Sequence, residues 1–325
     1  MRILSRQDVD ALISMQDVIA AMREVFADLA RGAASVPERT VLSMPGTDNS
    51  VLFMPGLLAK SGSVGVKVVS VFPTDAARGI PTISAQILLC DSETGVAKAL
   101  LEGGRITALR TAATTALATQ YLAREESSRL GVFGAGVQAK AQVESHLVVR
   151  PLARIAVFDV DKKRAATLVS DVRSLVEGKC ECVAAESPAE ILGTSDIIIA
   201  ATTSHTPVFD GKSVREGTHI NAIGSFKPEV REVDDTTVKR ARLFVDSYEH
   251  ALNEAGDLIM PMKSGIIKRD DIRAELGELI VGSKKGREQA REITFFKSVG
   301  MAVQDIAVAE LAYRRACERS LGLEV

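Results

Sequence analysis

A glycine-rich segment carries the clearest chemical signal in this chain of 325 residues. Gly134, Gly136 and Ala139 form a G-x-G-x-x-A pattern between a β-branched run and a helical run. In such a loop the first glycine allows a tight turn, the second lets the backbone approach a pyrophosphate, and the alanine permits close packing of helix on strand. The N–H groups that begin the helix then bind the phosphates. The pattern predicts a dinucleotide site at 134–139.

An acidic residue stands where such a site needs one. Asp159 ends the next predicted strand, 23 residues after Gly136, and an acid about 20 residues beyond the loop binds the adenosine ribose hydroxyls of a dinucleotide. A carboxylate there repels the 2′-phosphate of NADP(H), so NAD(H) is the favoured cofactor. The basic residues within 161–164 leave NADP(H) open. The alternative interpretation is a glycine turn and a surface aspartate in another kind of α/β protein.

Three hydroxyl residues stand at the end of a further apolar run. Thr202, Thr203 and Ser204 end the predicted strand that begins at Asp196. Ligands of parallel sheets bind outside the carboxyl ends of the strands, so these three residues are predicted to contact the cofactor. Turn formation, which serine and threonine also favour, is the competing explanation.

Three basic residues in the first third of the chain have apolar neighbours, namely Arg39, Lys67 and Arg110. Burying an unpaired ammonium costs several kcal/mol, so Lys67, inside the apolar run 64–72, is expected to have an anionic partner. If that partner is a substrate carboxylate, the forked guanidinium groups of Arg39 and Arg110 complete its binding site. Strand alternation equally allows an outward-facing lysine and two structural ion pairs.

The other candidates for chemistry give weaker signals. The four histidines lack the spacing of metal ligands, and His219 is expected to pack within a buried strand. The four cysteines are too few and too scattered for a disulfide framework, and Cys180 and Cys182 do not form a CxxC pair. We therefore predict no metal site.

Composition argues against several classes of protein. The 40 basic and 42 acidic residues give a net charge of −2, and the chain has no tryptophan and 4% aromatic residues, so no nucleic-acid partner is expected. Hydrophobic residues make up 46% and charged residues 25%, as in ordinary globular proteins. No apolar run reaches the ~18–20 residues of a membrane span, and the first residues are too polar for a secretory signal. We expect a cytoplasmic protein with no membrane partner.

Two kinds of architecture must position the candidate residues. Capped amphipathic helices open the chain at Ser5 and Ser14, and an alanine- and threonine-rich helix covers 107–123. Short strands separated by turns lie between them. These predicted strands are 40–44, 64–72, 83–90 and 95–101.

From Ser127 onward, strands alternate with helical segments, which is typical of a Rossmann-type, doubly wound parallel sheet. A last helix at 301–318 is expected to pack back onto the first domain. The fold class is therefore α/β, with an α+β domain at 1–126, to which 304–325 returns, and a dinucleotide-binding domain at 127–303. The predicted strands of the second domain are 129–133, 154–159, 180–184, 196–202, 218–224 and 242–246.

Taken together, several separated stretches resemble the ornithine cyclodeaminase/mu-crystallin family over nearly the whole chain. They are VKVV at 66–69, RGIPT at 78–82, TALRTAA at 107–113, GAGVQA at 134–139, GTHINAIG at 217–224, VDS at 245–247 and ITFFKSVG at 293–300. The resemblance implies a homodimer whose first domain supplies the subunit contacts and the substrate site, with NAD(H) or NADP(H) on the second domain.

The resemblance also implies roles for individual residues. Arg39, Lys67 and Arg110 hold the substrate carboxylate or line the nicotinamide pocket, and Met54 and Ser225 contact the substrate. Cofactor contacts are assigned to Val137, Gln138, Thr203, Ser204, Ser225, Ser298, Val299 and Gly300, with Val299 facing the nicotinamide.

One departure from the family pattern bears on the reaction. Cyclodeaminases of the family have a Gly-x-Asp sequence at the place where this chain has Gly224, Ser225 and Phe226. A phenyl ring accepts no proton, which argues against ornithine cyclisation. The stretch 224–232 is similar instead to the branch of ketimine reductases and bacterial reductases of cyclic imino acids.

The resulting hypothesis is NAD(P)H-dependent reduction of Δ1-pyrroline-2-carboxylate or Δ1-piperideine-2-carboxylate to proline or pipecolate. Arg39 and Arg110 fix the carboxylate, and Lys67 holds or donates the iminium proton. Glu229 is a second proton-donor candidate, with a solvated loop carboxylate as its alternative. The rival functions are a cyclodeaminase, an alanine dehydrogenase and a non-catalytic small-ligand binder. Ring size is not readable, since one methylene is worth only about 1–3 kcal/mol.

Overall fold

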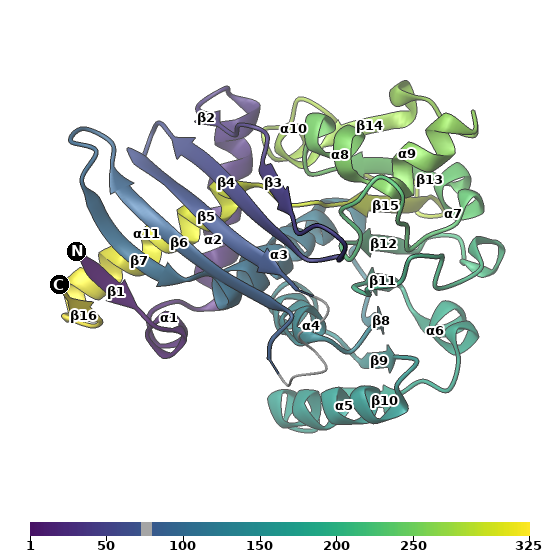
Figure 1. The fold of residues 1–325 in the computed structure, drawn as a ribbon. Coiled ribbons are helices and arrows are strands. Elements are labelled where there is room, and N and C mark those ends of the chain that lie inside the picture. Colours follow the sequence, from purple (N-terminus) through teal and green to yellow (C-terminus); the bar gives the residue numbers. More distant parts are fainter. Residues whose placement is uncertain (73–79) are drawn as a thin grey trace. The chain divides into compact units, whose positions relative to one another are not determined.

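The computed structural model describes residues 1–72 and 80–325, which divide into two units (Figure 1). Unit 1 comprises residues 1–110 and 301–325, and unit 2 comprises residues 111–300. Each unit contains its own eight-stranded sheet. This arrangement confirms the predicted α/β class, with a doubly wound domain and a second domain of mixed structure.

The division between the units falls inside helix α3 (Gly103–Leu122), at a different place from the predicted boundary after residue 126. The second half of α3 belongs to unit 2 because its polar side chains bond to that unit. Thr119 Oγ1, for example, lies 3.0 Å from Nε2 of the buried His146. The alanine- and threonine-rich composition gave the helix correctly, but it did not indicate this change of partner.

Two helices open unit 1, as the capping pattern predicted. They are α1 (Arg6–Leu12) and α2 (Met15–Ala30). Each begins with a serine and an aspartate that accept hydrogen bonds from each other's backbone N–H groups; in α2 these are Ser14 and Asp17. Such a box satisfies two of the backbone donors that a helix start leaves open.

The sheet of unit 1 has the order β16-β1-β7-β6-β5-β4-β2, with β3 paired to β4. All pairs are antiparallel except β1 with β7. Its strands are β1 (Arg2–Leu4), β2 (Ala34–Ser35), β3 (Thr40–Ser43), β4 (Ser50–Leu58), β5 (Ser63–Val71), β6 (Ile83–Asp91), β7 (Ala97–Glu102) and β16 (Leu323–Glu324). The family-like stretch at 78–82 lies partly outside the described residues.

Strand β4 was not predicted, because Pro55 and Gly56 interrupt its β-branched pattern. The structure shows why glycine stands there. A Cβ at position 56 would lie 3.0–3.2 Å from Ile306, Val303 and Ala302, so the helix that carries them packs directly on the strand.

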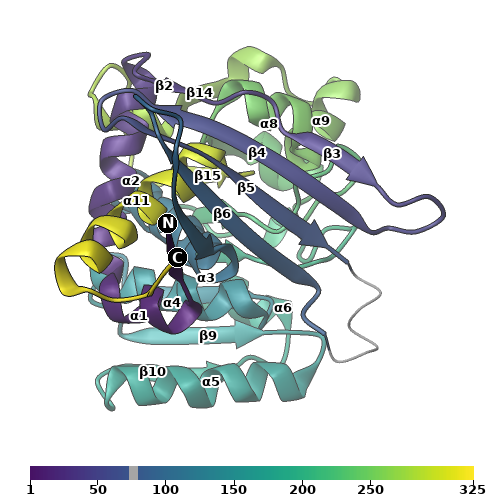
Figure 2. The same cartoon turned by 60° about the vertical axis from the view of Figure 1, so that its left-hand side comes forward.

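That helix is α11 (Ala302–Arg319), and together with α2 it packs on one face of the sheet (Figure 2). Side chains of a strand alternate between faces, so every second residue of β4, β5 and β6 points toward α11. Met54, Lys67 and Ile87 share this face, because the strand register aligns them. A lysine is thereby placed in an apolar layer.

Unit 2 contains a fully parallel sheet of order β10-β9-β8-β11-β12-β15-β13-β14. The chain winds outward from β8 in both directions, which places a topological switch point between β8 and β11. The strands are β8 (Arg129–Phe133), β9 (Arg154–Phe158), β10 (Glu181–Ala184), β11 (Ile197–Ala200), β12 (His219–Ala222), β13 (Ala241–Val245), β14 (Ile272–Glu275) and β15 (Ile293–Lys297).

Helices flank this parallel sheet. They are α4 (Val137–Val149), α5 (Lys162–Val176), α6 (Pro188–Thr194), α7 (Asp235–Arg240), α8 (Tyr248–Glu254), α9 (Gly256–Lys263) and α10 (Leu276–Ile280). Isoleucines of β11 and phenylalanines of β15 are fully buried in the core of the unit. None of the helices in the described parts of the chain is long and apolar enough to cross a membrane.

Candidate active site

The glycine loop of unit 2 has the backbone that a pyrophosphate requires. Gly134 has a φ of +96°, and a Cβ there would lie 2.5 Å from the carbonyl oxygen of Ala201. Gly136 caps α4, and apart from its chain neighbours no atom of the described residues lies within 4 Å of the place where its Cβ would stand. The first glycine is therefore needed by the fold, whereas the second keeps open space at the start of a helix.

Asp159 lies at the end of β9 and holds this loop. One carboxylate oxygen accepts a hydrogen bond from the backbone N–H of Ala135 at 2.7 Å, and the other accepts one from Asp161 at 2.8 Å. The residue remains half exposed, so each oxygen keeps a lone pair for a ribose hydroxyl. Nearby, Val137 and Val160 are 75% and 94% exposed. The residues present fit a dinucleotide with an unmodified ribose.

Two of the three predicted cofactor contacts after β11 form hydrogen bonds within the protein. Thr202 donates its backbone N–H and its hydroxyl to Glu232, and the Ser204 hydroxyl donates to the carbonyl of Thr206. These hydroxyls thus shape the turn after β11, as the competing explanation held. Thr203 is exposed, and the roles of all three at a cofactor stay predictions.

Gln138 adds a different observation. Its side-chain oxygen Oε1 is buried and has no hydrogen-bond partner among the residues that the structure describes. A buried acceptor without a donor costs about 1–3 kcal/mol, so this oxygen is suited to accept a bond from a ligand at the loop.

Three carboxylates that the sequence analysis did not select organise the carboxyl end of the sheet. The Glu232 carboxylate joins β11 to β12, because it accepts bonds from the backbone N–H groups of Thr202 at 2.7 Å and Gly224 at 2.6 Å. Burial raises its pKa, against the charge of Lys297. The fully buried Lys297 and Asp257 form an ion pair of 2.7 Å.

The predicted contact Ser225 belongs to the same network. Its hydroxyl donates to Asp257 at 2.8 Å and accepts from Lys297 at 3.2 Å. Burial opposes ionisation of Asp257, but Lys297 holds the pKa of this carboxyl below its usual value. Ser225 is 2% exposed, so its proposed contact with a ligand stays a prediction.

Asp246 forms the third of these anchors. One oxygen accepts hydrogen bonds from the Ser298 hydroxyl at 2.7 Å and from the backbone N–H groups of Val299 and Gly300, both at 2.8 Å. The turn predicted to contact the nicotinamide is therefore wrapped around one carboxylate. The VDS stretch belongs to the family-like pattern, but the pattern alone gives its aspartate no role.

In unit 1, two of the three predicted basic residues meet at one carboxylate. Asp305, in the first turns of α11, accepts a hydrogen bond from the Lys67 ammonium at 2.7 Å and one from Arg110 Nε at 3.1 Å. The side chains of Lys67 and Asp305 are 3% and 0% exposed. Lys67 is therefore inward-facing and paired, and its anionic partner belongs to the protein.

The neighbouring residue of α11 also binds Arg110. Gln304 Oε1 accepts from Arg110 Nη1 at 2.8 Å and from the backbone N–H of Met301 at 2.8 Å. The guanidinium of Arg110 is thus held on two sides by adjacent residues of one helix. Met54, the predicted substrate contact, is a buried apolar neighbour of Lys67 across the β4–β5 pair.

Burial and neighbouring charges set the pKa values of this cluster. Burial lowers the pKa of Lys67 to about 8; the charge of Asp305 opposes this change, and the positive charges of Arg110 and Arg39 add to it. Burial alone would raise the pKa of Asp305, but Arg110 and Lys67 hold it below its ordinary value. Two cations thus share the carboxylate of Asp305, and the charge of Arg39 also acts on Lys67.

Asp305 is the residue that sequence reasoning missed. Its signal was an aspartate between Val303 and Ile306 on the apolar side of the last helix. A buried carboxylate among apolar neighbours needs a cationic partner, and the buried Lys67 needs an anionic one, so the two residues could have been matched.

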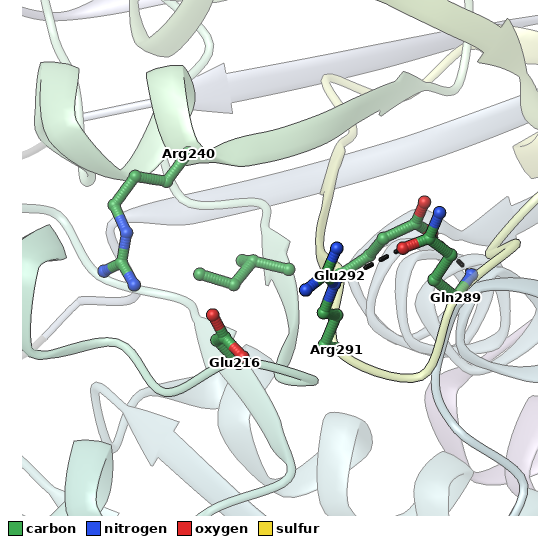
Figure 3. A pocket seen from close by; sticks show the side chains of 6 residues that line it. Glu216, Arg240, Gln289, Arg291 and Glu292 are labelled. Atoms are coloured by element: carbon green, nitrogen blue, oxygen red, sulfur yellow. Dashed lines mark hydrogen bonds between the residues drawn. The ribbon is translucent and has the colours of Figure 1, made fainter.

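Other candidates lie outside these sites. Glu229 is exposed. The side chain of His219 is fully buried, and this burial lowers its pKa well below the usual value. A cavity of about 250 Å³ in unit 2 is lined by charged side chains, among them Glu216 and Arg240 (Figure 3), and it lies at the strand ends opposite to the glycine loop. The described residues hold no cluster of potential metal ligands.

Known proteins resemble the chain over its whole length. The sequence model of the ornithine cyclodeaminase/mu-crystallin family matches residues 1–320. A Delta(1)-pyrroline-2-carboxylate reductase of Bacillus cereus is 37% identical over 323 residues, which cover 99% of this chain and 98% of the relative.

Two solved structures have a similar fold. The Delta(1)-pyrroline-2-carboxylate reductase of Thermococcus litoralis, in complex with NADH and L-proline, is 44% identical, covers 100% of both chains and has a TM-score of 0.97. An archaeal alanine dehydrogenase dimer with bound NAD is 35% identical, covers 100% of this chain and 98% of its own, and has a TM-score of 0.93.

Proposed function

This chain belongs to the ornithine cyclodeaminase/mu-crystallin family, and we propose that it is an NAD(H)-dependent reductase of small cyclic 2-imino carboxylates. The substrate that the named relatives favour is Δ1-pyrroline-2-carboxylate, which yields proline. The observation that carries the proposal is the buried contact of Lys67 and Arg110 with Asp305, near enough to Arg39 for its charge to act on Lys67. Guanidinium and ammonium groups are the donors that a substrate carboxylate and an imine nitrogen need.

The carboxylate of the substrate is bound by the guanidinium groups. Arg110 is pre-oriented, because Gln304 and Asp305 hold two of its nitrogens before any ligand arrives. A group that is already fixed loses little conformational entropy on binding, so its bond to the carboxylate contributes more to affinity. Arg39, whose charge reaches Lys67, is the second candidate for this contact.

Lys67 supplies the proton. Its ammonium has three N–H donors, and within the described part of the chain its hydrogen-bond partner is Asp305. The two other donors are available to the imine nitrogen, and a pKa of about 8 makes the ammonium a better acid than an ordinary lysine. When bound, the reduced dinucleotide supplies the hydride. Activity is expected to fall as the pH rises through about 8, since the neutral amine has no proton to donate.

The dinucleotide is assigned to unit 2. Gly134, Gly136 and the start of α4 fit a pyrophosphate, and Asp159 fits the ribose hydroxyls. NAD(H) is favoured over NADP(H) because a 2′-phosphate would approach an oxygen that is already anionic. The bound NADH and NAD of the two similar structures support the same choice.

Two further functions stay as alternatives. Phe226 occupies the place at which cyclodeaminases have their aspartate, which argues against ornithine cyclisation. Alanine dehydrogenation is favoured by one specific observation, the similarity to the archaeal enzyme. Both reactions use a carboxylate-binding cluster, so substrate trials must separate them.

The test is turnover of NADH by the purified protein. We expect oxidation with Δ1-pyrroline-2-carboxylate and formation of proline, and little with pyruvate plus ammonia or ornithine plus NAD⁺. Lys67→Ala is expected to abolish reduction while leaving the affinity for NADH nearly unchanged. Lys98→Ala is the matched control, since Lys98 pairs with Glu310 at 2.9 Å outside the cluster and its loss should leave turnover intact. Turnover of ornithine alone would contradict the proposal.

A homodimer is part of the proposal. The face of the unit 1 sheet opposite to α11 presents half-exposed apolar side chains on adjacent strands, and apolar faces of this kind mark interfaces. They include Val51, Phe53, Val64, Val66, Val68 and Leu88. The dimer of the similar alanine dehydrogenase supports an assembly of two copies.

Light scattering on the eluted protein tests this assembly. The wild-type chain is expected to elute as a dimer, and Val66→Asp is expected to give monomers because it introduces a charge into the apolar face. Leu175→Asp, at a 46% exposed position of α5, should leave the dimer intact.

The roles assigned to segments 1–126 with 304–325 and 127–303 stay proposals, and so does a cytoplasmic location.

A further inference from the structure

We propose that Asp305 is a positioning residue that holds the Lys67 ammonium in place and keeps it charged at working pH. The inference rests on the proposed role of Lys67 as proton donor. Asp305 is not assigned a role as base or acid, because its side chain is 0% exposed and both of its oxygens accept hydrogen bonds from the protein. One accepts from Lys67 at 2.7 Å, and the other accepts from Arg110 at 3.1 Å and from the Thr107 hydroxyl at 3.3 Å.

The contact with Asp305 fixes the position of the Lys67 ammonium. Lys67 projects from the middle of β5, and its four-carbon side chain has several rotatable bonds that would otherwise leave the ammonium mobile. The contact with Asp305 ties it to the first turns of α11, a helix that packs tightly on β4 at Gly56. The donor is therefore fixed by two rigid elements of the same unit.

The negative charge of Asp305 also favours the protonated form of Lys67. Within the described residues, the charged groups that face Lys67 are Asp305 from α11, Arg110 from α3 and Arg39 from the segment before β3. The flanking strands contribute the uncharged Met54 and Ile87 at this level. Two cations and burial favour the neutral amine, and one carboxylate opposes them. Without it, an ammonium in this layer would lose its proton at a much lower pH.

The discriminating variant is Asp305→Asn, which keeps size and hydrogen-bonding ability but removes the charge. The alkaline limb of the pH–kcat/KM profile, expected near pH 8 in the wild type, should move to lower pH by about one unit or more, since an opposite charge at hydrogen-bond distance shifts a pKa by about 1–3. Turnover at pH 7.5 should fall at least about threefold, because a shift of one unit lowers the protonated fraction of Lys67 by that factor, and it should recover in part at pH 6. An unchanged limb would overturn the proposal.

Matched variants separate charge from position. Asp305→Glu restores the charge with a longer side chain, so the limb should return toward its wild-type pH while kcat stays reduced. Gln304→Ala removes the neutral acceptor next to Asp305, so it should raise the KM for the imino acid and leave the limb where it is. A limb that moves equally in Gln304→Ala would show a general disturbance of α11 and contradict a specific role of Asp305.

A measurement without turnover keeps the inference distinct from the proposed function. The ε-carbon resonance of Lys67 in ¹³C-lysine-labelled protein, assigned with Lys67→Arg, reports the lysine titration directly. Its midpoint should lie near pH 8 in the wild type and lower in Asp305→Asn. If no imino acid is reduced but this midpoint moves, the function is wrong and the inference stands. If reduction proceeds and neither midpoint nor limb moves, the inference is wrong and the function stands.

Discussion

At the scale of single residues, the two glycines of the loop differ in what they do. Gly134 is needed for folding, because its φ is positive and a side chain would collide with the backbone at Ala201. Gly136 has an ordinary φ of −84° and empty space around its missing side chain. Apart from its place as N-cap of α4, nothing in the packing of unit 2 calls for a glycine here, and the open space suits a ligand that comes close to the backbone.

This difference predicts opposite outcomes for two alanine substitutions. Gly136→Ala should change the free energy of unfolding by less than about 1 kcal/mol, yet weaken NADH binding at least about tenfold, because the methyl group occupies the approach to the helix start. Gly134→Ala should destabilise the protein by more than about 2 kcal/mol, through a left-handed backbone and a steric collision. Denaturant unfolding and NADH fluorescence titration measure the two quantities. Loss of stability in Gly136→Ala, with binding intact, would contradict this assignment.

At the scale of elements, buried carboxylates fix the turns that follow the parallel strands. Glu232 joins the ends of β11 and β12, and Asp246 gathers the turn after β15. Turns of this kind have many backbone N–H groups and few regular partners, so a carboxylate with several lone pairs is an efficient acceptor. The loops that must receive a ligand are thereby rigid before it binds.

The prediction for this scale concerns Asp246→Asn. The amide retains one acceptor oxygen but turns an NH₂ group toward backbone donors, so at least one bond of the 298–300 turn is lost at a cost of about 1–3 kcal/mol. Affinity for NADH should fall about tenfold, and the melting temperature should fall by a few degrees. Ser247→Ala, which removes the cap of α8 and leaves the turn, should lower the melting temperature without a change in NADH affinity. Equal NADH affinities in wild type and Asp246→Asn would show that the turn does not serve the dinucleotide.

Sequence patterns predicted most of these elements because they depend on local rules. Helix caps, alternation and the order of strands and helices gave the doubly wound sheet and the paired helices of unit 1. Strand β4 was missed, since Pro55 and Gly56 obscure a strand whose shape is set by the contact with α11. Its position depends on residues about 250 places away in the chain, which no local pattern contains.

The same limit explains what was predicted of the site. Lys67 and Arg110 stood out because each has apolar neighbours, and the structure brings both to one place. Asp305 did not stand out, because a polar residue on a helix is ordinary until its face is known to be buried. The carboxylates of unit 2 were missed for the same reason, since their partners are backbone groups of distant turns.

At the scale of the whole molecule, the folded chain depends on histidines that are buried without charge. His146 belongs to α4 and is fully buried, where Nε2 lies 3.0 Å from the Thr119 hydroxyl of α3 and Nδ1 lies 2.7 Å from the Gln142 carbonyl. Burial lowers its pKa to about 4. A histidine in the unfolded chain titrates near pH 6.5, so the two states bind protons differently over this range.

The direction of the effect follows from proton linkage. Between pH 6.5 and about 4 the unfolded chain holds a proton on residue 146 and the folded chain does not, so acid favours unfolding. The full contribution, about 3 kcal/mol, is present above pH 6.5 and is lost progressively as the pH falls toward 4. His219, also buried and with a lowered pKa, acts in the same direction.

We therefore predict that urea unfolding of the wild type shows a free energy that declines from pH 7 to pH 4.5. His146→Gln should be less stable at pH 7, because the ring leaves a space in the core, but its decline with acid should be shallower. The difference between the two slopes isolates residue 146 from the carboxylates, which both proteins share. The exposed His205 offers the control, since His205→Gln should reproduce the wild-type slope. Parallel slopes for wild type and His146→Gln would mean that this ring takes up protons as readily in the folded chain as in the unfolded one.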